Sequence, residues 1–190
     1  DVRTAAEIAD NLDNTLVDWR RSIAAYAIEF RSRFSAALDE IDTPALTEVL
    51  VEADGGGYRQ WSELSAGILV ALPWRSKPAA AELERHWQTA FPPAAIGMAG
   101  LGETLEALRS RALKMGIVTN GGSASQNAKI DALALRPYMS AIVISEEAGV
   151  SKPDPAIFHA ALEQLGLRAS QTWFVGDNPT ADILGAASAG

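Results

Sequence analysis

The sequence contains no cysteine and only two histidines among its 190 residues. Disulfide bridges, thiolate metal sites and a cysteine nucleophile are therefore excluded, and two isolated histidines cannot form a histidine-rich metal site. A metal ion in this protein would have to bind oxygen atoms.

Basic residues are also scarce. Lysine and arginine number 16 against 24 acidic residues, which leaves a formal net charge of -8 without a basic cluster. Recognition of a nucleic-acid backbone depends on clustered lysine and arginine, so we expect no nucleic-acid partner. No apolar run is long enough for a bilayer, and the N-terminus lacks the pattern of a secretory signal. We expect no membrane partner and a cytoplasmic location, and no pattern indicates an oligomeric state.

Short apolar runs alternate with helical patterns in the second half of the chain. Asp154 and Pro155 have the residue types of an N-cap and a first helical position. Strands that alternate with helices predict a parallel sheet covered on both faces. The predicted strands are residues 115–119, 141–144 and 172–175, and the predicted helices between them are 123–133 and 155–165.

The first half of the chain has helical patterns instead. They cover residues 19–38, 58–72 and 79–91, and glycines and prolines interrupt them. We therefore predict an α/β protein with a Rossmann-like parallel sheet core, helices on both faces, and an inserted all-α cap domain. The predicted core comprises residues 1–16 and 98–190, and the predicted cap comprises residues 17–97. The last residues resemble the end of a helix that leads to a further edge strand, so we expect such a strand after Gly190.

Polar residues follow each predicted strand, where an open parallel sheet binds its ligands. A threonine hydroxyl, a lysine ammonium and paired carboxylates at one edge can hold a phosphate group and a magnesium ion. Each residue alone has a simpler explanation as a turn, a cap or a surface side chain, but the combination favours a site. The residues concerned are Asn11, Asp13, Thr15, Thr119, Asn120, Lys152, Asp177 and Asp182.

Four segments, NLDNTLVD, GIVTNG, SKPDPAIF and FVGDNPTADILGA, resemble in order the four motifs of haloacid-dehalogenase-like hydrolases. The helical block resembles the cap that this family inserts after its first motif. The stretch ISEEAGVSKPDPAIF is similar to the phosphatase branch, which includes 5′-nucleotidases and phosphatases of small phosphorylated metabolites. The resemblance therefore implies a magnesium-dependent phosphatase that acts on a small phosphomonoester through an aspartyl-phosphate.

The resemblance also implies a role for each matching residue. Asp13 would be the general acid/base, and Thr15 would support the first loop and the substrate. Thr119, Asn120 and Lys152 would hold the phosphoryl group. Mg²⁺ would bind at position 11, at Asp13 and at Asp177, with Asp182 in support.

Position 11, where the family has its nucleophilic aspartate, is an asparagine in this chain. An amide oxygen is neutral and a poor nucleophile, and the change removes a negative charge from the predicted magnesium site. Asp10 is a poor replacement, because a residue three before Asp13 points to the opposite face of a strand. The resemblance therefore predicts that the chain belongs to a family of enzymes. Asn11 predicts that this chain itself has little or no activity.

Three alternatives stay open. A haloacid dehalogenase shares the fold but needs no metal, and Asp13 with Thr15 favours the phosphatase. A catalytically silent protein that binds a phosphorylated ligand or a protein partner is supported by Asn11. A dinucleotide-binding protein is disfavoured, because no G-x-G-x-x-G turn follows a strand. Five residues of the predicted cap could reach a substrate, but packing in the core or exposure to solvent explains residues of these types better than substrate contact. They are Trp19, Arg20, Tyr58, Arg59 and Trp61.

Overall fold

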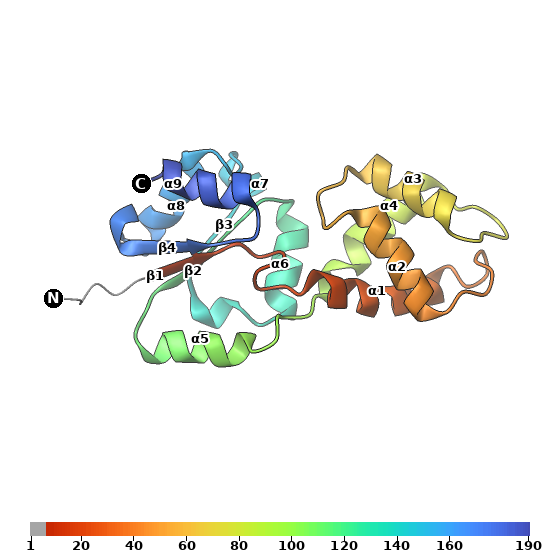
Figure 1. The fold of residues 1–190 in the computed structure, drawn as a ribbon, viewed down its shortest axis with the longest axis horizontal. Helices are drawn as coiled ribbons and strands as arrows, with labels where there is room; N and C mark the ends of the chain where they lie inside the picture. Colours follow the sequence, from red (N-terminus) through yellow and green to blue (C-terminus); the bar gives the residue numbers. More distant parts are fainter. Residues whose placement is uncertain (1–6) are drawn as a thin grey trace. The chain divides into compact units, whose positions relative to one another are not determined.

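The computed structural model describes the backbone of residues 7–190 and the side chains of residues 11–190 (Figure 1). The chain divides into two compact units. The first comprises the N-terminal residues up to Asp18 together with Gly97–Gly190, and the second comprises Trp19–Ile96. The role of the second unit as a cap stays a prediction.

A four-stranded parallel sheet forms the centre of the first unit, with the strand order β3-β2-β1-β4. Strand β1 (Glu7–Asp10) lies between β2 (Met115–Thr119) and β4 (Thr172–Val175), and β3 (Met139–Ile144) lies beyond β2. The predicted α/β class with a parallel sheet is confirmed. The carboxyl ends of β1, β2 and β4 therefore meet at one edge.

Helices lie on both sides of this sheet, with α5 opposite α8 and α9 (Figure 1). Buried Ile157, Phe158 and Ala161 of α8 pack with Val118 of β2 and Val143 of β3. The helical segments of the first unit are α5 (Leu101–Ser110), α6 (Ser123–Ala132), α7 (Ser145–Ala148), α8 (Pro155–Leu165), α9 (Gly185–Ser188), the 3-10 turns η2 (Arg136–Tyr138) and η3 (Ala169–Gln171), and the π-helical η4 (Pro179–Leu184).

Local sequence signals determine where α8 begins and ends. The Asp154 carboxylate accepts a hydrogen bond from the Ala156 backbone N–H at 2.9 Å, and Pro155 occupies the first turn. Gly166 ends the helix with φ = +69°, a left-handed conformation that glycine adopts without steric cost. Both ends agree with the sequence prediction because caps depend only on neighbouring residues.

The second unit consists of helices, as its sequence pattern predicts, although one helix was not anticipated. Asp42 caps the start of helix α2, since its carboxylate accepts a hydrogen bond from the Ala45 N–H at 2.7 Å, and Pro44 lies in the first turn of the helix. Helix α1 ends at Arg33 and not at residue 38, because the chain turns there and Leu38 forms a bridge with Trp74. The helices are α1 (Trp19–Arg33), α2 (Thr43–Asp54), α3 (Trp61–Ala71), α4 (Ala80–Ala90) and the 3-10 turn η1 (Pro92–Ala94).

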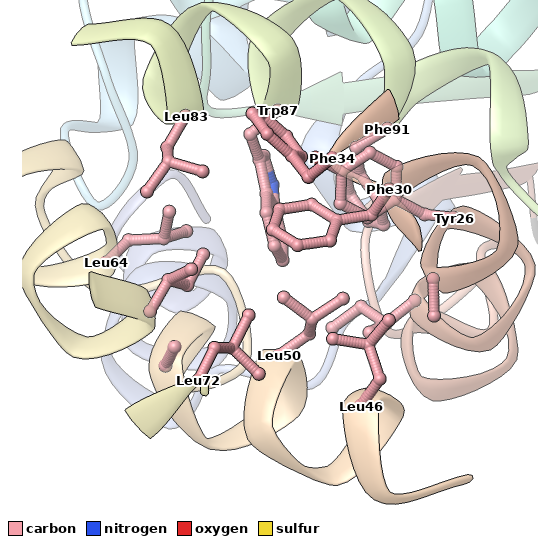
Figure 2. Packing of buried hydrophobic residues seen from close by; sticks show 14 of the residues in the cluster. Tyr26, Phe30, Phe34, Leu46, Leu50, Leu64, Leu72, Leu83, Trp87 and Phe91 are labelled. Atoms are coloured by element: carbon pink, nitrogen blue, oxygen red, sulfur yellow. The ribbon is translucent and has the colours of Figure 1, made fainter. Parts of the chain in front are cut away.

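The core of the second unit combines aromatic rings with leucine side chains (Figure 2). The rings of Tyr26 and Trp87 lie 4.8 Å apart edge to face, and those of Trp87 and Phe91 lie 5.2 Å apart. Trp19 packs on Phe91 with ring centroids 4.7 Å apart, and its indole N–H donates to Asp54. Trp19 is therefore a packing residue of this unit. Throughout residues 7–190, every helix is too short or too polar to cross a membrane.

Candidate active site at the carboxyl edge of the sheet

Asn11 follows β1 and connects three segments of the first unit. Its backbone N–H donates to the Val175 carbonyl at 2.9 Å, which continues the pairing of β1 with β4. The side-chain Oδ1 accepts from Lys152 Nζ at 3.0 Å, and Nδ2 donates to Asp177 Oδ1 at 2.8 Å and to the Asp13 carbonyl at 2.9 Å. The predicted nucleophile position therefore lies beside the predicted lysine and the predicted metal ligands.

Lys152 is buried and held from two directions. Its Nζ donates to Asp182 Oδ1 at 2.6 Å, and both side chains are almost fully buried. Asn120 fixes the backbone of Lys152, since its Nδ2 donates to the Lys152 carbonyl at 3.0 Å and its Oδ1 accepts the Lys152 N–H at 2.8 Å. Burial lowers the pKa of Lys152, and the hydrogen bond and charge of Asp182 oppose that shift. The ammonium is thereby directed at Asn11.

Asp182 supports the lysine, and its position depends on a glycine. Its second oxygen accepts the Asn178 N–H at 3.0 Å. A Cβ on Gly176 would lie 2.4 Å from Asp182 Oδ2, so only glycine allows this approach. The structure thus places the Asp182 carboxylate against Lys152 and the backbone, whereas Asp177 is exposed and contacts Asn11.

Asp13 lies in a tight turn that follows Asn11. The backbone N–H groups of Leu16 and Val17 both donate to the Leu12 carbonyl, and the turn includes Asn14 with φ = +57°. Thr15 is half-buried in the same turn. This turn presents the Asp13 carboxylate toward α6.

Two residues of α6 that lie outside the four sequence motifs hold Asp13. Lys129 Nζ donates to both carboxylate oxygens of Asp13, at 2.8 and 2.9 Å, and Gln126 Nε2 donates to Asp13 Oδ2 at 3.0 Å. Gln126 Nε2 also lies 2.6 Å from Thr119 Oγ1, so it joins the ends of β1 and β2. The sequence does contain a signal for these two residues. Gln126 and Lys129 are three residues apart, so they share one face of a helix that begins just after the Thr119 turn.

The phosphatase branch that the sequence resembles is magnesium-dependent, and the directions of the oxygen atoms in the site show whether such an ion fits between them. Hard cations need several oxygen ligands with free lone pairs directed at one point. Here the Asp13 carbonyl and Asp177 Oδ1 both face the NH₂ group of Asn11, and Asp182 faces Lys152. Among the residues that the structure describes, no three His, Cys, Asp or Glu side chains are grouped to hold a metal ion. As the side chains lie, the site does not fit a magnesium ion.

Residues 12–190 match the family described as haloacid dehalogenase-like hydrolase. The pyrimidine 5′-nucleotidase YjjG of Escherichia coli is 47% identical over 92 residues, which cover 48% of this chain and 40% of that protein. The phosphoglycolate phosphatase of Yersinia pseudotuberculosis is 30% identical over 193 residues, which cover 96% of this chain and 77% of that protein. The chain thus spans less than half the length of several curated relatives that it matches.

Solved structures share the fold. The HAD-hydrolase YfnB from Bacillus subtilis, whose structure was determined bound to magnesium, superposes with a TM-score of 0.75 at 21% identity, over 99% of this chain and 86% of that one. A 2-haloacid dehalogenase from Pseudomonas syringae has a TM-score of 0.56 at 24% identity, over 97% of this chain and 83% of that one. These likenesses concern the fold alone, whereas the family match covers nearly the whole sequence. The chain belongs to the haloacid dehalogenase-like hydrolases.

Proposed function

We propose that this site binds the phosphoryl group of a small phosphorylated metabolite, as in the phosphatase branch of the family. The observation that carries the proposal is the buried Lys152, whose Nζ lies 3.0 Å from Asn11 Oδ1. A buried ammonium beside the position of the nucleophile offers a charge-assisted donor to a phosphate oxygen. The phosphatase names of the relatives that cover most of the chain support the same reading.

Each residue of the site has a chemical task in this proposal. Thr119 ends β2, and Asn120 follows it. Both residues would orient the phosphoryl oxygens together with Lys152, while Thr15 would support the first loop. Asp13 would protonate the leaving oxygen and later deprotonate water, and the pair Lys129 and Gln126 holds its carboxylate in place. Magnesium, in a relative with an aspartate at position 11, would offset the charge of the phosphate.

With asparagine at position 11, the site could bind a phosphomonoester without hydrolysing it. Without an anionic oxygen at this position no aspartyl-phosphate can form, and loss of a nucleophile costs on the order of 10⁴ to 10⁶ in catalysis. A chain that retains Lys152 and Asp13 would still hold a phosphomonoester. Asn11 also favours the second candidate, a catalytically silent protein that binds a phosphorylated ligand. The cytoplasmic location stays a prediction.

The binding half of the proposal is tested with inorganic phosphate and orthovanadate on the parent chain, Lys152→Met and Lys77→Met. Loss of one charge-assisted hydrogen bond should weaken anion binding about 10-fold to 100-fold in Lys152→Met. The exposed Lys77 lies in the second unit and serves as the matched control. Calorimetric titration gives the affinities, and equal affinities in all three chains would remove Lys152 from the site.

The catalytic half is tested by Asn11→Asp with p-nitrophenyl phosphate in the presence of magnesium. The variant should hydrolyse it at least about 10⁴ times faster than the parent, because it regains the attacking oxygen. Asn11→Ala is the control that lacks both the amide and the carboxylate. Equal, negligible rates in a folded Asn11→Asp and in the parent would favour the silent binding protein.

A further inference from the structure

The side-chain amide of Asn11 uses its full hydrogen-bonding capacity. Oδ1 accepts from Lys152 Nζ at 3.0 Å and from the Leu12 N–H at 2.9 Å. Nδ2 donates to the Asp13 carbonyl at 2.9 Å and to Asp177 Oδ1 at 2.8 Å. The residue is 8% exposed, so little water competes for these bonds. Two donor hydrogens and two acceptor lone pairs all have partners.

Only one orientation of the amide satisfies these partners. If the amide were rotated by half a turn, its NH₂ group would face the Lys152 ammonium and the Leu12 N–H, while its oxygen would face two oxygen atoms. Four hydrogen bonds would become four repulsive contacts in a buried place. The NH₂ group therefore points at Asp13 and Asp177.

An aspartate at position 11 would have no such donor. One of its oxygens could still accept from Lys152, but the other would face the Asp13 carbonyl and the Asp177 carboxylate without a hydrogen atom between them. Two carboxylates at this distance in a partly buried site repel each other unless a cation lies between them. The oxygens that Asn11 Nδ2 bridges are the ones that would need that cation.

We propose that the NH₂ group of Asn11 replaces a divalent cation in this site. Its two N–H bonds join the Asp13 carbonyl to Asp177, so the end of β1 and the loop after β4 are held together without metal. The three carboxylates of Asp13, Asp177 and Asp182 lie near two ammonium groups, those of Lys129 and Lys152, so the formal charge of these five side chains is -1. An aspartate at position 11 would add one more negative charge and restore the requirement for a cation.

Thermal unfolding of metal-stripped protein tests this inference, with and without added Mg²⁺. The parent should show no shift in Tm. Asn11→Asp should unfold at a lower temperature than the parent without Mg²⁺, and Mg²⁺ at about 100 times its Kd should raise its Tm by about 5 to 10 °C. An Mg²⁺-induced shift in the parent as large as that in Asn11→Asp would overturn the proposal.

A second variant exchanges the two groups and keeps the test decisive if Asn11→Asp folds poorly. In Asn11→Asp/Asp177→Asn the amide lies on the other side of the contact, so one NH₂ group again faces the oxygens and the formal charge equals that of the parent. Its metal-free Tm should return to within about 2 °C of the parent, because exchanging the two groups leaves a free-energy change of well under about 1 kcal/mol. A Tm as low as that of metal-free Asn11→Asp, or lower, would contradict the bridge.

This inference rests on the same residues as the proposed function but not on any substrate. Mg²⁺ is the only probe, and Tm is read without turnover. A failure of phosphate binding in the parent would therefore overturn the proposed function and leave the replacement of the cation intact. A Tm shift of the parent on addition of Mg²⁺ would overturn the replacement of the cation and leave the proposed function intact.

Discussion

Lys129 Nζ lies 2.8 Å from Asp13 Oδ1, although 116 residues separate the two in the sequence. The lysine side chain is 5% exposed and the aspartate side chain 23% exposed. Asp13 lies in the turn after β1 and Lys129 lies on α6, so the pair joins two elements that approach each other only in the folded protein. The contact holds the carboxylate to which the proposed mechanism assigns proton transfer.

Lys129→Met should lower the free energy of unfolding by about 1 to 3 kcal/mol. Removal of one partner of a buried pair costs about 3 to 5 kcal/mol, and the partial exposure of Asp13 reduces that figure. Urea unfolding gives the value. Lys77→Met, at an exposed position, should stay within about 0.5 kcal/mol of the parent. A Lys129→Met protein as stable as Lys77→Met would show that the contact contributes no net stability.

Gly176→Ala should destabilise the protein by at least about 2 kcal/mol. The added Cβ would lie 2.4 Å from Asp182 Oδ2 and would displace the carboxylate from Lys152. A buried ammonium whose partner moves away is costly. Thermal or urea unfolding of the variant measures the loss, and weaker phosphate binding should accompany it because Lys152 loses its anchor.

Gly102→Ala is the matched control for that substitution. Gly102 lies within α5, and a Cβ there would have no other atom within 4 Å. Alanine forms helices better than glycine, so this variant should be more stable than the parent by about 0.5 to 1 kcal/mol. The two substitutions are chemically identical, but they should change the free energy of unfolding in opposite directions. Equal effects would show that the space around Gly176 is not limiting.

Stability should fall as the pH drops below about 6.5, and His86 should account for part of the fall. Burial lowers the pKa of His86 in the folded protein, so the unfolded chain takes up the proton first. The stabilisation is therefore complete above the unfolded pKa and declines as the pH falls toward the lower folded pKa. The neutral ring lies 2.8 Å, Nδ1 to Oη, from Tyr26.

Urea unfolding of the parent, His86→Gln and His159→Gln between about pH 8 and pH 5 checks this expectation. His86→Gln should give a flatter profile than the parent. His159 is exposed on α8 and is the other histidine of the chain, so its variant should follow the parent. A His86→Gln profile as steep as that of the parent would assign the acid sensitivity to other groups.

Much of the architecture could be predicted from the sequence because it depends on neighbouring residues. The apolar runs that became β2 and β4 and the cap at Asp154 are local patterns. The polar residues at the strand ends could also be selected, since a parallel sheet brings those ends together. Helix α2 escaped prediction, although Asp42 and Pro44 provide the signals of a helix start.

The sequence alone determined that an asparagine occupies position 11 and that Asp13, Lys152 and Asp177 follow different strands of one sheet. Only the tertiary structure decided what these groups do to one another. The direction of the Asn11 amide depends on partners up to 166 residues away, and the support of Asp13 by Lys129 spans 116 residues. Local preferences cannot specify such contacts, because a buried amide or ammonium takes the orientation that satisfies all surrounding donors and acceptors, and those are assembled only by the fold.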